Sequence, residues 1–449
     1  MNVPAALTNT HKNEILLFYT LLELTLIVVA GRVGGVIAKR CGQSTAVGEI
    51  IIGICLGPSL FGLLAPRAFD YVFHSAPPEP LTILSNVGLI LLMFQIGLEF
   101  DFAHLAERVN RAAVLRVSSA CLAIPFACGF ALGLFIARDA PAAHRLDTAL
   151  FVATAFSITA LPILGRIMIE FNLTRTRLGV IAISSAAVND VIGWLLLALV
   201  TALTASDFLA GQFALRIAMV AAFGLISAMV ARPLLKRAIR SSPPRDGKMS
   251  ANLLGGLLAV IFTAAMTTYQ IGIFAIFGGF MMGVILYDEP DLVAAWRGRM
   301  GDFVAVFFLP IFFTYTGLRT SIGGLDTWAD WGLCLAIVAS ASIAKLGGGY
   351  LAARRSGFDH PQSAIIGFMM NTRALMELIV INVGLDLGVI SPKVFTMLVI
   401  MAIFSTVITT PALRHYLKRI DLGASDRLAG PSGIGVDGAG REAGARTRG

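Results

Sequence analysis

The sequence has little charge for its length. Only 14% of its 449 residues are Asp, Glu, Lys or Arg, whereas about 25% of an average soluble domain is charged. A soluble chain of this length would form about two or three domains joined by polar linkers, and no such change of composition occurs along the chain. The scarcity of charge, together with 57% hydrophobic residues, favours a membrane protein.

The usual motifs of catalysis and nucleotide binding are also missing. The five cysteines have no C-x-x-C spacing and lie mostly in apolar segments, and the six histidines fall in loops or at the ends of apolar runs. No group of His, Cys and carboxylates has the spacing of metal ligands, and no G-x-x-x-x-G-K-[ST] phosphate loop occurs. We therefore expect no enzyme activity, no cofactor and no ATP site.

What the sequence has instead is a series of long apolar runs. Most have roughly 18–28 residues, which is enough to cross about 30 Å of hydrocarbon as a helix. They predict an all-α polytopic membrane protein with about thirteen transmembrane helices, of which the ninth is short. The runs cover residues 15–38, 46–64, 81–99, 112–137, 148–169, 178–204, 211–235, 252–270, 272–287, 302–318, 331–353, 361–388 and 394–413.

The positions of Lys and Arg predict the orientation. If the N-terminus lies outside, most of the 35 Lys and Arg residues fall in cytoplasmic connections. Residues 1–14 are then extracytoplasmic, residues 15–413 form the membrane domain, and residues 414–449 form a cytoplasmic tail whose composition predicts disorder. The net charge of +8 follows from this topology and does not indicate nucleic-acid binding. We expect a multi-pass protein of a bacterial inner membrane.

Asp190 is the most informative residue of the chain. With Asn189 before it, Asp190 lies in a run from Val180 to Val200 that carries no other charge. A carboxylate at the centre of a bilayer costs roughly 2.5–3.5 kcal/mol on insertion scales, so it requires compensation. A transported cation, a proton or a buried partner would supply it; a structural polar contact between helices is the alternative.

Two further apolar runs carry buried charges. Lys345 lies among small residues that let helices approach closely, where it could form an internal salt bridge or serve transport. Arg373 and Glu377 are four residues apart and can pair on one helix face. Asn371 and Thr372 directly before them compete for backbone hydrogen bonds and weaken the helix.

The fifth predicted span has an interruption of its own. Pro162 removes an amide donor, while Ser157 and Thr159 offer hydroxyl groups to the freed backbone. The fifth span is the middle one of spans 4–6 and the twelfth is the middle one of spans 11–13, and the two triplets have opposite orientation. Matched interruptions of this kind indicate a transporter site near the midplane of the membrane.

Several stretches, taken together, resemble one known family. The most specific are LPIFFTYTGLRTSI (309–322) and MNTRALMELIVINVGLDLGVIS (370–391); the others are residues 42–62, 84–101, 157–200 and 277–289. In order and over residues 15–413, the chain resembles the monovalent cation:proton antiporters of the cation:proton antiporter-2 branch. This branch belongs to the sodium/hydrogen exchanger superfamily and includes the plant cation/proton exchangers.

The resemblance implies an inverted-repeat fold and a homodimer. A core, about residues 112–204 and 331–413, would move like an elevator against a scaffold made of the other helices, and helices 5 and 12 would unwind and cross beside the ion.

The resemblance also implies roles for individual residues. Asp190 matches the family's ion-binding carboxylate, Asn189 the residue before it, Thr159 the polar residue at the helix-5 break and Lys345 the basic residue of helix 11. Arg373 and Glu377 match charged positions with structural or gating roles. Some relatives have a Ser one turn before the key Asp; here that position is Ala186, with Ser185 adjacent.

The expected activity is exchange of Na⁺ or K⁺ for H⁺ at Asp190. Asn189 favours electroneutral exchange, whereas release of a proton from Lys345 would move two protons per cation. Three alternatives stay open: a sodium-coupled symporter of an organic anion, a proton-uncoupled K⁺ efflux pathway, and an ion-responsive receptor.

Overall fold

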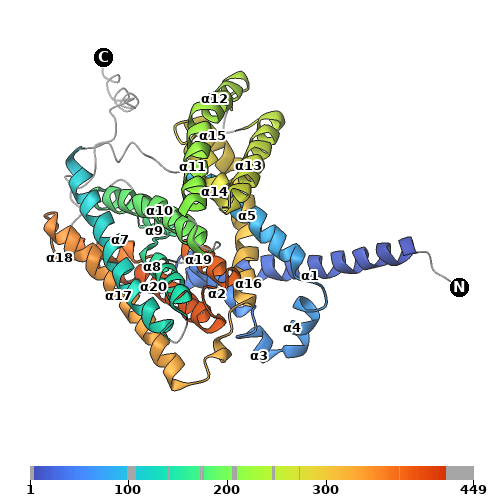
Figure 1. The fold of residues 1–449 in the computed structure, drawn as a ribbon, viewed down its shortest axis with the longest axis horizontal. Coiled ribbons are helices and arrows are strands. Elements are labelled where there is room, and N and C mark those ends of the chain that lie inside the picture. Colours follow the sequence, from blue (N-terminus) through green and yellow to red (C-terminus); the bar gives the residue numbers. More distant parts are fainter. Residues whose placement is uncertain are drawn as a thin grey trace, which may run out of the picture.

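The computed structural model describes residues 5–98, 108–138, 141–171, 173, 176–204, 210–244, 248–272, 274–373 and 375–420. Within these ranges nearly every residue is helical, and no β-sheet forms (Figure 1). In the first half the helices are α1 (Ala5–Arg40), α2 (Thr45–Cys55), α3 (Phe61–Leu64), α4 (Pro66–Phe73), α5 (Glu79–Leu98), α7 (Arg108–Ile136), α8 (Ala142–Ser157), α9 (Leu161–Glu170), α10 (Arg177–Thr204), α11 (Ala210–Ile226) and α12 (Arg232–Ser241). In the second half they are α13 (Ala251–Ile271), α14 (Ala275–Val284), α15 (Pro290–Trp296), α16 (Leu309–Leu318), α17 (Trp328–Arg355), α18 (His360–Met370), α19 (Leu375–Asp386) and α20 (Pro392–Leu417).

The predicted all-α polytopic fold is confirmed. Among the described residues, nine helices are long and apolar enough to cross a membrane. The other four predicted spans are the short helices α2 and α14 and two broken pairs, α8 with α9 and α18 with α19. Each of the thirteen predicted runs therefore has a helical counterpart, and the two predicted interruptions fall in the two broken pairs.

Some predicted boundaries are wrong. The second span was predicted as residues 46–64, but α2 ends at Cys55, because Pro58 cannot continue a helix. The first helix begins at Ala5, before the predicted boundary at residue 15, and α20 continues to Leu417, past the predicted boundary at 413. Most of the predicted tail, residues 421–449, lies outside the described residues.

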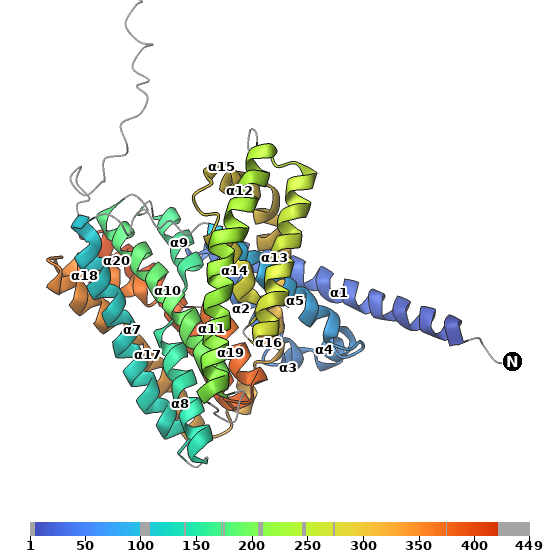
Figure 2. The same cartoon turned by 45° about the horizontal axis from the view of Figure 1, so that its top comes forward.

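The helices pack as two bundles. In the first bundle α7 packs on α8, α10 and α17, and α17 packs on α18 and α20. In the second bundle α1 packs on α2, α14 packs on α5 and α13, and α16 packs on α2 and α5. Figures 1 and 2 show these bundles side by side, with α1 extending away from the body of the molecule.

Glycine allows a very close contact inside the second bundle. A Cβ added at Gly57 would collide with the carbonyl of Gly317, and one added at Gly317 would collide with the backbone of Gly53. Small residues that let two backbones touch are typical of helix contacts in membranes, where van der Waals packing replaces the hydrophobic effect. The α2–α16 contact makes this bundle a rigid neighbour for the first one.

Candidate ion-binding site

The two interrupted helices meet at their breaks. The helix α8 ends at Ser157 and α9 begins at Leu161, while α18 ends at Met370 and α19 begins at Leu375. The amide of Ala160, in the first break, donates a hydrogen bond of 2.9 Å to the carbonyl of Thr372, in the second. The crossing expected from the resemblance is therefore present, and it is tied by a backbone hydrogen bond.

Four helix ends converge on this crossing. The helices α8 and α18 bring their C-terminal carbonyl groups, and α9 and α19 bring their N-terminal amides. Carbonyls at a helix C-terminus lack partners within the helix and carry partial negative charge, while N-terminal amides carry partial positive charge. In the apolar interior of the first bundle these ends need partners of the opposite sign.

Two cationic side chains occupy the carboxyl end of α8. The Arg373 guanidinium donates hydrogen bonds to the carbonyls of Ala155 and Phe156, at 3.2 and 2.9 Å. The Lys345 ammonium donates to the carbonyl of Ser157, and also to that of Cys121 in α7 at 3.0 Å. The unpaired carbonyls at the end of α8 thus accept hydrogen bonds from two buried basic side chains.

Arg373 also forms an ion pair with an acidic side chain. Among the described residues, Lys345 forms no ion pair. The guanidinium contacts both carboxylate oxygens of Glu377 at 3.1 and 3.2 Å, and both side chains are fully buried. The pairing predicted from their spacing is therefore formed. The salt bridge considered for Lys345 is not formed across the described residues, because backbone carbonyls accept from its ammonium group instead.

Asp190 lies beside the amino end of α9. Its side chain is 1% exposed, and the backbone amide of Leu161 lies close enough to the carboxyl group to stabilise its charge. Over the described residues, neither carboxyl oxygen accepts a hydrogen bond of ordinary geometry. An aspartate with this environment retains unused acceptor capacity on both oxygens.

Other polar atoms near the crossing are equally unsatisfied. The hydroxyl groups of Thr159 and Thr372 and the carboxamides of Asn189 and Asn371 are buried and make no hydrogen bond to any described residue. Buried polar atoms in native proteins are nearly always partnered, so a group of them points to a missing ligand or to water. The hydroxyl and amide oxygens in this group are ligands that suit a hard cation.

Ser185 is placed differently from expectation. Its hydroxyl donates to the carbonyl of Val114 in α7 at 3.3 Å, so it serves a contact between helices. Ser157 fits the expectation, since its hydroxyl donates at 2.8 Å to the carbonyl of Thr154, in the last turn of α8 before the break. The contact of Ser157 with Lys345 is made by its carbonyl oxygen.

Pro162 does not interrupt a helix in its middle, as expected from the sequence. It is the second residue of α9, whereas the break covers residues 158–160. At this position the missing amide hydrogen would have had no partner within the helix, so proline favours the start of α9.

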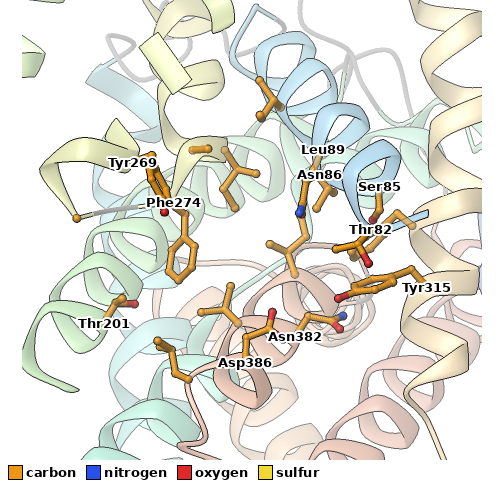
Figure 3. A pocket seen from close by; sticks show the side chains of 18 residues that line it. Thr82, Ser85, Asn86, Leu89, Thr201, Tyr269, Phe274, Tyr315, Asn382 and Asp386 are labelled. Carbon is orange, nitrogen blue, oxygen red and sulfur yellow. The ribbon is translucent and has the colours of Figure 1, made fainter. Parts of the chain in front are cut away.

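A cavity of about 610 Å³ separates the two bundles beyond the site (Figure 3). The helices α10 and α19 form one wall, and α5, α13, α14 and α16 form the other. Asn86 and Tyr315 on the one side face Asn382 and Asp386 on the other. The sequence analysis assigned no role to Asn382 and Asp386, although both lie in the family-like stretch 370–391, because nothing local shows that they face α5 and α16.

One arginine connects the two bundles at this cavity. Arg319, directly after α16, donates to the carboxylate of Asp386 at 2.5 Å and to the side-chain oxygen of Asn382 at 3.1 Å. The amide of Asn382 donates in turn to the hydroxyl of Thr316 at 2.9 Å.

Comparison with known proteins identifies the family. Residues 24–419 match the profile of a family described as sodium/hydrogen exchanger, transmembrane. The chain belongs to the sodium/hydrogen exchanger family. It is an integral multi-pass membrane protein of a family of transporters.

Individual members agree with this assignment. The chain is 38% identical over 399 residues to the Na⁺/H⁺ antiporter NhaS4 of Synechocystis, covering 88% of this chain and 96% of that protein. It is 34% identical to the cation/H⁺ antiporter 17 of Arabidopsis thaliana over 414 residues, which cover 89% of this chain and 48% of the plant protein. The chain therefore spans about half the length of that plant relative.

A solved structure supports the fold. The sodium proton antiporter NhaP1 from Methanocaldococcus jannaschii aligns with a TM-score of 0.62 at 14% sequence identity, covering 88% of this chain and 97% of that one. At this identity the likeness shows the shared fold alone. The all-α polytopic antiporter fold expected from the sequence is thereby supported.

Proposed function

We propose that this chain exchanges a monovalent cation, Na⁺ or K⁺, for H⁺ at Asp190. The observation that carries the proposal is the buried carboxyl group of Asp190, which accepts no ordinary hydrogen bond from the described residues and lies beside the crossing of two broken helices. Thr159 and Asn371 in the two breaks, and Asn189 directly before Asp190, supply further unsatisfied oxygen atoms. The names of NhaS4 and of the plant relative agree with cation/proton exchange.

The exchange follows from competition for one carboxylate. The Asp190 carboxylate can hold a cation with the help of neighbouring oxygens, or it can hold a proton, and occupancy by one excludes the other. An empty carboxylate would be an uncompensated charge in a medium of low dielectric constant, so the unloaded carrier crosses slowly. Each productive cycle therefore carries a cation one way and a proton the other way.

We propose that the exchange is electroneutral. Asn189 cannot ionise, which leaves Asp190 as the single exchanging carboxylate of the pair. Lys345 donates hydrogen bonds to two backbone carbonyls, which gives it a structural role that requires no exchange of a proton. One proton then moves for each cation.

Movement of the first bundle past the second would provide alternating access. The proposal is supported by the packing of α7–α10 with α17–α20 as one unit and by the cavity that lies between this unit and the scaffold. We further propose a homodimer formed through the scaffold, in a bacterial inner membrane with the N-terminus outside. The exposed apolar side chains along α1 are consistent with contact with lipid or with a second copy.

Purified protein in liposomes that contain a pH-sensitive dye tests the exchange. A pH gradient is imposed, Na⁺ or K⁺ is added, and wild type is compared with Asp190→Asn. Cation-dependent proton movement is expected in wild type and in Asp291→Asn, a control at an exposed aspartate in the first turn of α15, and it should be absent in Asp190→Asn. Proton movement that persists in Asp190→Asn contradicts the site, and cation-dependent uptake of an organic anion without proton movement would favour the symporter.

Electroneutrality is tested in the same liposomes. A membrane potential of about 100 mV changes the driving force by about 2.3 kcal/mol for each net charge moved. The electroneutral proposal expects the same exchange rate and the same final pH gradient with and without the potential. A final gradient that follows the imposed potential would show that Lys345 or another group carries a second proton.

A further inference from the structure

A second, smaller cavity lies where the turn after α1 meets the end of α20. It has a volume of about 290 Å³ and is formed by Cys41, Gly42 and Gln43 of the turn and by the last residues of α20, including Arg414 and Lys418. We call it the basic cavity. No carboxylate lines it, and His415 is its third basic side chain.

The basic side chains of the basic cavity have no anionic partner among the described residues. Across the described residues, Arg414, His415 and Lys418 form no ion pair, and all three side chains are exposed. Lys39 and Arg40 in the last turn of α1 add two more exposed positive charges directly before the turn. Such a concentration of like charge is unfavourable unless an anion neutralises part of it.

The arginine of the basic cavity packs against the turn after α1. A Cβ at Gly42 would collide with the Arg414 guanidinium, and Gly42 has a left-handed backbone with φ of 74°, which favours glycine. On another side, the guanidinium carbon lies 6.0 Å from the centre of the Phe171 ring. The turn itself is joined to α20, since the Gln43 side chain donates to the carbonyl of Val407 at 3.2 Å. The Arg414 guanidinium therefore lies between the turn and Phe171, where Arg414 lines the cavity.

The turn offers side chains and no free backbone amides. The amides of Cys41, Gly42 and Gln43 all donate to carbonyls in the last turn of α1, at 2.8–3.1 Å. Recognition would depend on Arg414 and Lys418, whose charged groups suit the oxygen atoms of a phosphate.

The cavity also lies at the level where phosphate groups of lipids occur. It is formed at the ends of two apolar helices, α1 and α20, on the side that the distribution of Lys and Arg predicts to be cytoplasmic. Anionic lipids concentrate in that leaflet, and basic pockets between membrane helices bind their headgroups. We propose that the basic cavity binds the phosphate group of an anionic lipid headgroup. The headgroup would contact α20 of the first bundle and the α1–α2 turn of the second.

Lipid affinity of the purified full-length protein tests this inference. Binding of phosphatidylglycerol and of phosphatidylcholine is measured by native mass spectrometry for wild type and for Arg414→Gln/Lys418→Gln. A positive charge near the membrane surface contributes about a fivefold gain in affinity, so the double variant is expected to bind phosphatidylglycerol about thirtyfold more weakly. Phosphatidylcholine binding is expected to be weak and equal in both proteins.

Two controls make the test specific. Arg240→Gln/Arg355→Gln removes the same charge from exposed residues outside the cavity and should keep wild-type affinity. Asp190→Asn should also keep it, which separates this inference from the proposed exchange. If the double variant does not fold, Lys418→Gln alone, at an exposed position after the last turn of α20, is expected to weaken binding about fivefold.

The outcomes are distinct. Unchanged affinity in the cavity variants, or an equal loss in the Arg240/Arg355 control, overturns the proposal in favour of diffuse surface charge. Competition by millimolar inorganic phosphate distinguishes a lipid headgroup from a soluble phosphate, since both present the same phosphate group. Displacement of the lipid assigns the cavity to a soluble phosphate, and its absence assigns it to the lipid headgroup.

Discussion

Lys345, in α17, and Arg373, in the break between α18 and α19, cap the same end of α8. The guanidinium of Arg373 contacts the carbonyls of Ala155 and Phe156, and the ammonium of Lys345 contacts the next carbonyl, that of Ser157. A broken helix inside a membrane exposes carbonyl groups that no water can satisfy, and these two cations supply the donors. Their first role is thus to stabilise the break that creates the site.

Loss of Lys345 should therefore destabilise the protein. Lys345→Met leaves the carbonyls of Ser157 and Cys121 without this donor, which should lower the free energy of unfolding by about 2–4 kcal/mol. Lys345→Gln retains hydrogen-bond donors and should recover part of the loss. Unfolding in mixed SDS micelles measures both values, with Lys12→Met, at an exposed residue of α1, as the control. Wild-type stability of Lys345→Met together with lost exchange would assign the lysine to proton transport instead.

The Arg373–Glu377 pair should respond asymmetrically to mutation. Removing one partner of a buried ion pair costs about 3–5 kcal/mol, because the other charge stays buried. Arg373→Met also uncovers two carbonyls of α8, whereas Glu377→Met uncovers none, so Arg373→Met is expected to destabilise more. A double-mutant cycle in the same unfolding assay gives the coupling energy. Equal effects of the two single variants would show that the contacts with α8 contribute nothing to stability.

The sequence predicts the helices and their breaks because both are local properties. Thirteen apolar runs, an Asn-Thr pair and a proline near hydroxyl residues are visible without tertiary structure. The partners of Lys345 could not be predicted, since a backbone carbonyl carries no residue signature. The two basic residues were still a signal, because a broken helix needs donors and Lys345 and Arg373 are basic residues inside apolar runs.

Other predictions failed because they depended on tertiary contacts or on local sequence that fits two structures. Ser185 is adjacent to the position expected from the family, and its hydroxyl turns to the carbonyl of Val114, which depends on how α10 packs against α7. Pro162 was placed at the break, but proline equally suits the first turn of a new helix, and local sequence does not distinguish the two. Arg319 and Asp386 each lie in a family-like stretch, but they are far apart in the chain, so their contact could not be predicted from either stretch.

Competition at one carboxylate predicts how pH and cation concentration interact. Protonation of Asp190 excludes the cation, so exchange should fall as the pH decreases, and the fall should move to lower pH when more cation is present. For one proton per cation, a tenfold rise in cation concentration moves the midpoint by about one pH unit, and for two protons by about half a unit. Initial rates in liposomes over a grid of pH and Na⁺ or K⁺ give this slope, and a midpoint independent of the cation would exclude direct competition.

The contact between Arg319 and Asp386 tests the proposed movement of the bundles. Arg319 follows α16 of the scaffold and Asp386 ends α19 of the core, so their separation must change if the core moves. In a cysteine-free background, Arg319→Cys/Asp386→Cys joined by a short thiol cross-linker is expected to stop exchange, and reduction of a cleavable linker should restore it.

A second pair provides the control for cross-linking within one bundle. Lys393 at the start of α20 contacts Asp330 in α17 at 2.8 Å, and both helices belong to the core. The cross-linked Lys393→Cys/Asp330→Cys variant should exchange ions at the rate of its uncross-linked form, because these residues move together. Full activity of the cross-linked Arg319/Asp386 pair would contradict an elevator motion, whereas inactivity of both pairs would mean that the core itself must deform during transport.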